Sequence, residues 1–211
     1  MVLNRPHVCG RLNSQTLSRL GLVSEKSDKS LFTNNDKSLL LHIHVNDGFL
    51  ISKSENTIVT FLNNLNAVLK FKYKRRPTLH LGYNLEWSNN NLKINQTDLI
   101  VKLLRQFEMQ DSKTLKTPCN GNFLNEINSN LSDDAIQATS FQQAIGSSNY
   151  LAYHTRPDVI FTINQLSKHS IKPNQCHWHA LKHLLCYLNG TKDCYEMKKI
   201  TSGNHRSLIR Y

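Results

Sequence analysis

Residues 39–52 have the sequence LLLHIHVNDGFLIS, which is an apolar run, an Asn-Asp-Gly step and a second apolar run. Asn-Gly and Asp-Gly turns between hydrophobic runs predict a β-hairpin, because a tight turn needs positive φ angles. This hairpin would carry Asp47 at its tip, with His44 and Asn46 leading into it. A carboxylate there is a ligand for a hard cation such as Mg²⁺, so Asp47 is the first candidate for chemistry.

The densest positive cluster of the chain consists of Lys70, Lys72, Lys74, Arg75 and Arg76, with Phe71 and Tyr73 between them. Alternate residues of an extended segment share a face, so the three lysines would line one side of it. Such a line of charges could contact a phosphate backbone. The alternatives are a solvated surface run and an incidental import signal.

The whole chain is basic, with 26 Lys plus Arg against 15 Asp plus Glu and a formal net charge of +11. This excess favours polyanionic partners. The sequence has no apolar stretch of roughly 18 residues and no signal-peptide pattern, so we expect no membrane partner and an intracellular location, cytoplasmic or nuclear. Five cysteines without a Cys-Xaa-Xaa-Cys spacing fit a reducing compartment.

Hydrophobic periodicity predicts an α+β fold, in which an antiparallel sheet with packed helices precedes a mainly helical region. We expect helices over 8–20, 58–69, 97–107, 139–153, 157–170 and 174–189, and strands over 30–33, 39–45, 49–52, 79–87 and 92–95. Thr97 is the expected N-cap and Gly190 the expected C-cap of their helices, while Pro157 and Pro173 suit first turns. The polar stretch 110–135 is expected to be a long loop.

Five ordered motifs carry a resemblance to a known family. They are Ile94-Asn95-Gln96 with Leu99-Ile100 and Leu103-Leu104-Arg105-Gln106-Phe107, then Thr117-Pro118, then Phe141 to Ala152, then Thr155-Arg156-Pro157-Asp158-Val159, and finally His177-Trp178-His179-Ala180-Leu181-Lys182 with Tyr187-Leu188-Asn189-Gly190-Thr191-Lys192-Asp193. In this order they are similar to the reverse transcriptase segment of copia-type LTR retrotransposon Pol polyproteins. The resemblance spans nearly the whole chain.

The hairpin in turn resembles the Tyr-Xaa-Asp-Asp hairpin of reverse transcriptases, whose adjacent carboxylates help to hold two divalent metal ions. Asp47 matches the second aspartate, whereas Asn46 stands at the first and His44 at the tyrosine. The family's third catalytic aspartate has no counterpart, because no Asp or Glu precedes Glu25. The resemblance implies an RNA-directed DNA polymerase that used Mg²⁺ ancestrally, and a degenerate chain that binds no metal and is catalytically inactive.

The family's palm-then-thumb order divides the chain into four parts. Residues 1–110 would be a partial palm with a primer-grip-like hairpin, 111–135 a linker, 136–190 a thumb-like helical region, and 191–211 the start of a truncated connection and ribonuclease H segment. On this basis the chain is a truncated, pseudogene-like segment, and further Pol segments are candidate partners.

Two further pairs of residues are implied as nucleic-acid contacts. Gly82 and Tyr83 lie in a segment that looks like a primer grip, and the alternative is an ordinary hairpin with Gly82 at a bulge. Gly146 and Tyr150 lie four apart on one helix face, as in thumb helices that follow a minor groove, and the alternative is a packing glycine with Tyr150 in the core. The implied partner is an RNA–DNA hybrid or primer–template duplex, weakly bound.

Other interpretations stay open at this point. The chain could be a non-enzymatic nucleic-acid-binding module, or an unselected transposon relic. A zinc site is a further candidate, because Cys176, His177, His179, His183 and Cys186 lie close in sequence, with His179 and His183 on one helical face. Zinc would need a third or fourth ligand that converges on them, and the family's His-Trp packing motif explains the same segment.

Overall fold

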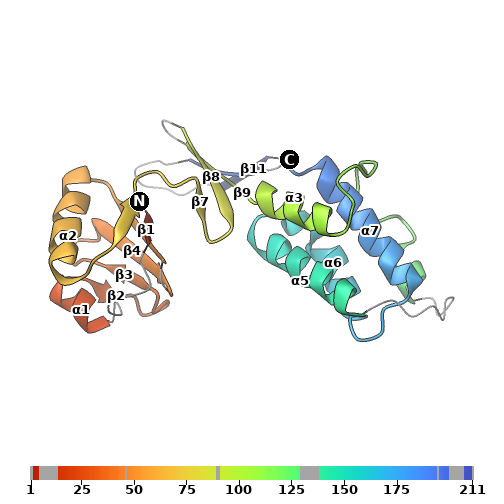
Figure 1. Ribbon diagram of the computed structural model, residues 1–211, viewed down its shortest axis with the longest axis horizontal. Coiled ribbons are helices and arrows are strands. Elements are labelled where there is room, and N and C mark those ends of the chain that lie inside the picture. The colour runs from red at the N-terminus through yellow and green to blue at the C-terminus, as the bar shows by residue number, and fades with distance from the viewer. Residues whose placement is uncertain are drawn as a thin grey trace. The chain divides into compact units, whose positions relative to one another are not determined.

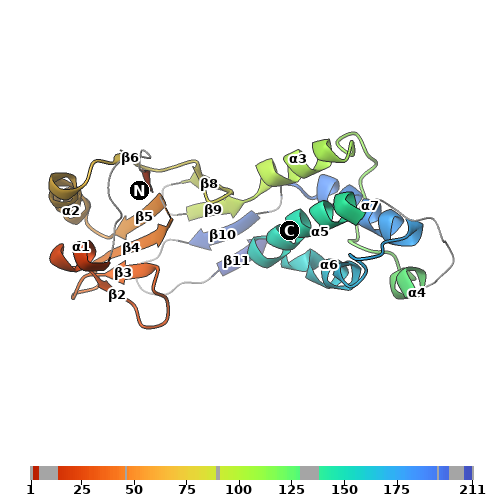
Figure 2. The same ribbon diagram turned by 60° about the horizontal axis from the view of Figure 1, so that its bottom comes forward.

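The computed structural model describes residues 2–4, 14–45, 47–88, 91–128, 138–193, 195–199 and 207–210. The chain forms two compact units, Met1–Pro77 and Thr78–Tyr211, called here the N-terminal and C-terminal units. Each has its own antiparallel sheet and its own hydrophobic core (Figure 1, Figure 2). Antiparallel sheets with packed helices confirm the predicted α+β class.

The N-terminal unit is a six-stranded sheet in the order β2-β3-β4-β5-β1-β6. Its strands are β1 (Val2–Asn4), β2 (Val23–Ser24), β3 (Leu31–Thr33), β4 (Leu39–His44), β5 (Asp47–Ser52) and β6 (Lys72–Lys74). Helices α1 (Ser14–Arg19) and α2 (Glu55–Val68) lie on one side of this sheet, as Figure 1 shows. The other face is therefore the one on which polar side chains can gather.

Alternation along β4 decides which face forms the core. Leu39 and Leu41 are buried and share the helix-covered face with Leu50 of β5. They pack against an apolar stripe of α2 that includes Phe61 and Leu65. Burying each of these large side chains stabilises the unit by roughly 1.5–3 kcal/mol. This core fixes the register of the hairpin that carries Asp47.

The C-terminal unit combines a five-stranded sheet with a helical region. The sheet, in the order β11-β10-β9-β8-β7, consists of β7 (Leu79–His80), β8 (Tyr83–Trp87), β9 (Asn91–Asn95), β10 (Tyr195–Lys199) and β11 (Ser207–Arg210). Figure 2 shows β8 to β11 side by side. The helices are α3 (Thr97–Gln106), α4 (Phe123–Asn128), α5 (Ala138–His154), the 3₁₀ turn η1 (Pro157–Val159), α6 (Ile160–Ser167) and α7 (Gln175–Gly190). None of the helices in the described residues combines the length and apolar character of a membrane span.

The observed division of the chain differs from the predicted one. The units separate at Pro77, rather than near residue 110, because β9 pairs with β10 and Leu103 joins the helical core. The predicted loop 110–135 contains α4, whose Phe123 and Ile127 are buried four residues apart. Polar neighbours hid this short helical spacing. The predicted helix over 8–20 begins at Ser14 in the described residues, and 8–13 lie outside them.

Two predicted helix caps are also wrong. Thr97 is the first residue of α3 rather than its N-cap, because its hydroxyl donates to the carbonyl oxygen of Lys192 at 2.9 Å. Gly190 is the last residue of α7, and the C-cap is Thr191. Pro173 precedes the N-cap of α7 and so lies outside its first turn, whereas Pro157 begins η1 as expected.

Candidate nucleic-acid interface

The predicted hairpin is confirmed, but Asp47 does not lie at its tip. Strand β4 ends at His44 and β5 begins at Asp47, and these two residues are paired across the hairpin. The connection between them consists of Val45, which has a φ of 52°, and Asn46, which lies outside the described residues. Gly48 is buried within β5 instead of forming the turn. The two-residue connection thus moves Asp47 into the sheet.

Asp47 lies in a row of residues that crosses the sheet. Its direct partners are His44 in β4 and Asn4 in β1, and Asn4 is in turn paired with Lys72 of β6. Directly opposite residues share a face of the sheet. No Asp or Glu is therefore a direct strand partner of Asp47. The described residues also contain no three His, Cys, Asp or Glu side chains that could hold a metal ion together.

The next row on this face joins His42, Phe49, Val2 and Lys74. We call His42, His44, Asp47, Lys72 and Lys74 the polar sheet face. His44 and both lysines are exposed, while His42 and Asp47 are half-buried. The register thus brings two predicted phosphate contacts and the predicted metal ligand onto one surface.

The other basic residues of the predicted cluster lie differently. Lys70 is exposed but precedes β6, so only Lys72 and Lys74 alternate within a strand. Arg75 forms an ion pair of 2.5 Å with Glu55, in the first turn of the helix that covers the opposite face. Arg76 is exposed and has a φ of 37°, which bends the chain away from the strand.

In the C-terminal unit, Gly82 lies in a tight turn rather than at a bulge. His80 and Tyr83 are paired, so Leu81 and Gly82 form the two-residue connection of β7 and β8. Their φ values are 48° and 78°, and positive φ at both central residues is the mark of a type I′ turn. Gly82 adopts this conformation without steric cost, whereas Leu81 does not.

This turn is docked on helix α5. The Tyr150 hydroxyl donates to the Leu81 carbonyl oxygen at 2.7 Å, and the Tyr83 hydroxyl is hydrogen-bonded to Nδ1 of His154 at 2.5 Å. The Tyr150 and His154 rings lie one helical turn apart, with centroids separated by 4.2 Å. We call these contacts of Leu81, Gly82 and Tyr83 with Tyr150 and His154 the tip contact. The structure thus brings three predicted nucleic-acid contacts together: Gly82, Tyr83 and Tyr150.

Gly146 faces open space on the same helix. A Cβ added at Gly146 would meet nothing within 4 Å, so this residue is not a packing glycine. Tyr150 is 37% exposed and does not belong to the core. The packing alternative for this pair is therefore wrong, and contact with nucleic acid at Gly146 stays a prediction.

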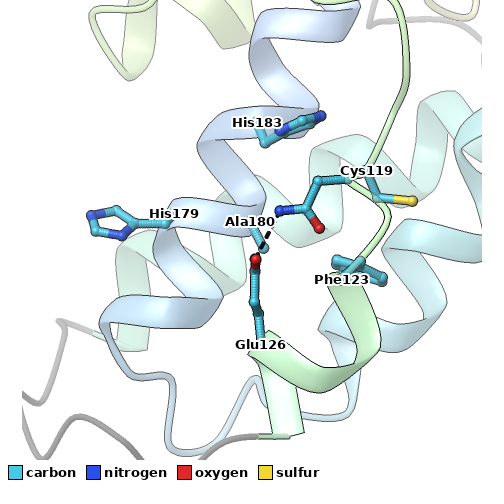
Figure 3. Close-up of a pocket in the computed structure, with 7 residues that line it drawn as sticks. Cys119, Phe123, Glu126, His179, Ala180 and His183 are labelled. Carbon is cyan, nitrogen blue, oxygen red and sulfur yellow. Dashed lines mark hydrogen bonds between the residues drawn. The ribbon is translucent and has the colours of Figure 1, made fainter.

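The histidines of α7 do not converge on a zinc site. His177 is buried, its Nδ1 accepts from the backbone N–H of the N-cap residue at 2.9 Å, and its Nε2 donates to the Ile127 carbonyl oxygen at 2.8 Å. His183 donates to the Thr117 carbonyl oxygen at 3.0 Å. Figure 3 shows His179 directed away from His183. These side chains instead hold α7 against its neighbours.

The sequence did not predict a buried polar cluster that joins two of the motifs. Arg156 is 2% exposed, and its guanidinium donates to both carboxylate oxygens of Asp158, at 3.0 and 2.8 Å. It also donates to the carbonyl and hydroxyl oxygens of Thr191, and Tyr187 donates to Asp158 at 2.7 Å. The pairing of Thr-Arg-Pro-Asp with Tyr-Leu-Asn-Gly-Thr in the motif pattern was the only signal for it.

The charges of this cluster shift two pKa values. Burial raises the pKa of Asp158, but the hydrogen bonds and charge of Arg156 outweigh this effect and hold that pKa below its ordinary value. Burial and the hydrogen bond to Asp158 raise the pKa of Tyr187 to about 12. The cluster is thus charged and internally paired at neutral pH. It joins the ends of α5 and α7 and lines no binding surface.

A family model described as reverse transcriptase (RNA-dependent DNA polymerase) matches residues 6–121, more than half of the chain. The chain belongs to this reverse transcriptase family. The matched part of the reverse transcriptase includes the Asp47 hairpin, the basic cluster and the hairpin of the tip contact. No solved structure matches this chain.

Relatives with similarity to this reverse transcriptase segment are Pol polyproteins of retrotransposons. The retrovirus-related Pol polyprotein from transposon RE2 of Arabidopsis thaliana is 30% identical over 199 residues, which cover 92% of this chain and 13% of that protein. The corresponding polyprotein from transposon TNT 1-94 of Nicotiana tabacum is 26% identical over 172 residues, 77% of this chain and 13% of the relative. The putative transposon Ty5-1 protein of Saccharomyces cerevisiae is 24% identical over 202 residues, 94% of this chain and 64% of that protein.

These relatives confirm the predicted copia-type Pol reverse transcriptase. The chain spans only 13% of the length of the first two relatives, so it corresponds to one segment of such a polyprotein.

Proposed function

We propose that this reverse transcriptase segment binds primer–template nucleic acid but does not polymerise DNA by itself. The observation that carries the proposal is the row around Asp47, in which His44 and Asn4 are the direct partners of the one matched carboxylate. Two-metal catalysis needs a clamp that holds both ions a few ångströms apart. Mg²⁺ prefers several oxygen ligands, and an imidazole suits other metals better.

Primer extension tests the catalytic part of this proposal. With Mg²⁺ or Mn²⁺ we expect no extension of an annealed primer above a heat-denatured control. Asn46→Asp would restore the second carboxylate of the hairpin, but we expect no rescue, because neither direct strand partner of Asp47 adds a third. Extension by the unaltered chain would contradict the proposed inactivity. Extension by the variant alone would show that two carboxylates suffice.

The polar sheet face supports the binding part of the proposal. Two exposed lysines lie on the face opposite the helices, and the chain carries a formal net charge of +11. Phosphate contacts release counterions, so they make affinity fall steeply with salt. An RNA–DNA hybrid is the duplex that the family membership favours, and we propose it as the partner.

Fluorescence anisotropy with a labelled RNA–DNA hybrid at rising salt tests this binding. We expect a linear fall of log affinity with log salt, and a slope reduced by about 2 in the double variant Lys72→Gln/Lys74→Gln. The matched control is Lys26→Gln/Lys29→Gln, which removes the same charge from exposed positions outside β6. An equal loss in both variants would show that only net charge matters. Binding that is absent, or indifferent to salt, would favour an unselected transposon relic.

A further inference from the structure

The groups that would bring nucleic acid close to the C-terminal unit are in contact with one another. Gly82 has no side chain, which would allow a phosphate backbone to approach closely. That space is filled by Tyr150, since a Cβ at Gly82 would meet Cε1 of the Tyr150 ring at 3.6 Å and its hydroxyl at 3.7 Å. The same hydroxyl is bonded to Leu81. By contrast, the surface at Gly146 is open.

We infer that the tip contact is autoinhibitory: the turn at Leu81 and Gly82, docked on α5, covers the surface that a nucleic-acid duplex would use. The turn must leave Tyr150 before a backbone can approach either Gly82 or the Tyr150 hydroxyl. This inference rests on the proposed nucleic-acid binding and names a contact that limits it.

The composition of the tip contact makes it reversible. Its two hydrogen bonds are exposed, so water competes for the same donors and acceptors and the net gain from each bond is small. The turn follows β7, a strand of two residues at the edge of the sheet. Segments with few buried contacts and exposed hydrogen bonds open most readily. If only the open fraction binds, the apparent affinity is reduced by that fraction.

Variants that loosen the turn while keeping the aromatic surface test the inference. Tyr150→Phe removes the bond to Leu81 and keeps the ring, and His154→Ala removes the bond to Tyr83. Tyr153→Phe is the matched control, because its hydroxyl lies on the same helix but bonds Asn164 instead. We would measure amide hydrogen exchange at residues 81–83, and anisotropy with a labelled RNA–DNA hybrid.

The inference requires both readouts to change together. We expect faster exchange of the turn amides and roughly two- to tenfold tighter hybrid binding in Tyr150→Phe and His154→Ala, with neither change in Tyr153→Phe. Faster exchange with unchanged or weaker binding would overturn the occlusion and leave the proposed binding intact. Tighter binding without faster exchange would also overturn it. Absence of binding in every variant, the unaltered chain included, would reject the proposed binding and the inference together.

Discussion

Arg156 is almost fully buried, yet every hydrogen bond described for its guanidinium ends on Asp158 or Thr191. A buried ion pair contributes little by itself, because desolvation offsets most of the attraction. Removing one partner is a different matter, since the other charge is then left buried and unpaired. At the residue scale, this cluster is therefore a point where a single change should be costly.

Asp158→Asn tests this point. The variant keeps the size of the side chain and removes its charge, so we expect a loss of about 3–5 kcal/mol in the free energy of unfolding, measured by urea denaturation. Tyr187→Phe is the control, because it removes one hydrogen bond to the same carboxylate and should cost only about 1 kcal/mol. Equal losses in both variants would argue against an unpaired charge.

The pH dependence of Asp158→Asn gives a second readout of the same prediction. The folded-state pKa of Asp158 lies below its ordinary value of 3.8, so its contribution is present above that pH. The contribution is lost as pH falls through the folded-state pKa. The acid-induced loss of stability should therefore be smaller in Asp158→Asn than in the unaltered chain.

At the element scale, two helical glycines have opposite surroundings. A Cβ at Gly190 would lie 2.9 Å from Cβ of Thr114 and 3.3 Å from the Leu115 carbonyl oxygen, so the end of α7 needs a glycine where this loop crosses it. Asn189 fixes the same loop by donating to the Gln110 carbonyl oxygen at 3.1 Å. The close approach, and not a capping conformation, explains why glycine stands at this position.

The two glycines give a matched prediction. We expect Gly190→Ala to lower the free energy of unfolding by about 1–3 kcal/mol through overpacking. Gly146→Ala should raise it by about 0.5–1 kcal/mol, because alanine stabilises a helix and the site is open. Urea denaturation measures both. A destabilised Gly146→Ala would show that the open surface at this position has been misjudged.

Local pattern was sufficient for some elements and not for others. The Asp47 hairpin and helix α2 were predictable, because alternation and 3.6-residue periodicity are written within a few residues. The pairing of β1 between β5 and β6 has no local signal, although it alone sets Lys72 in the row of Asp47. The docking of Gly82 on Tyr150 joins residues 69 positions apart in the hydrogen bond to Leu81, and sequence spacing cannot reveal such a contact.

At the scale of the whole molecule, the chain consists of two units with separate cores. Both tryptophans, Trp87 and Trp178, belong to the C-terminal unit. Two-state unfolding is an approximation that applies to single domains and fails when domains unfold separately. Tryptophan fluorescence therefore reports on one unit, while far-ultraviolet circular dichroism reports on both.

We expect the urea transitions seen by these two probes not to coincide. The control is Asp158→Asn, which should shift the fluorescence transition and leave one component of the dichroism transition in place. Coincident transitions that move together in this variant would mean that the units unfold as one cooperative body.

The pairing of β9 with β10 sets an order in time as well as in space. Ile94 is paired with Glu196, so about 100 residues of intervening chain must be drawn into a closed loop. Closing a long loop costs entropy before any strand pairing compensates for it. The bond from Thr97 to Lys192 and those from Arg156 to Thr191 hold the base of this loop once the helices have packed. The helical region thus acts as a folding template for the returning strand, and the sheet is completed last.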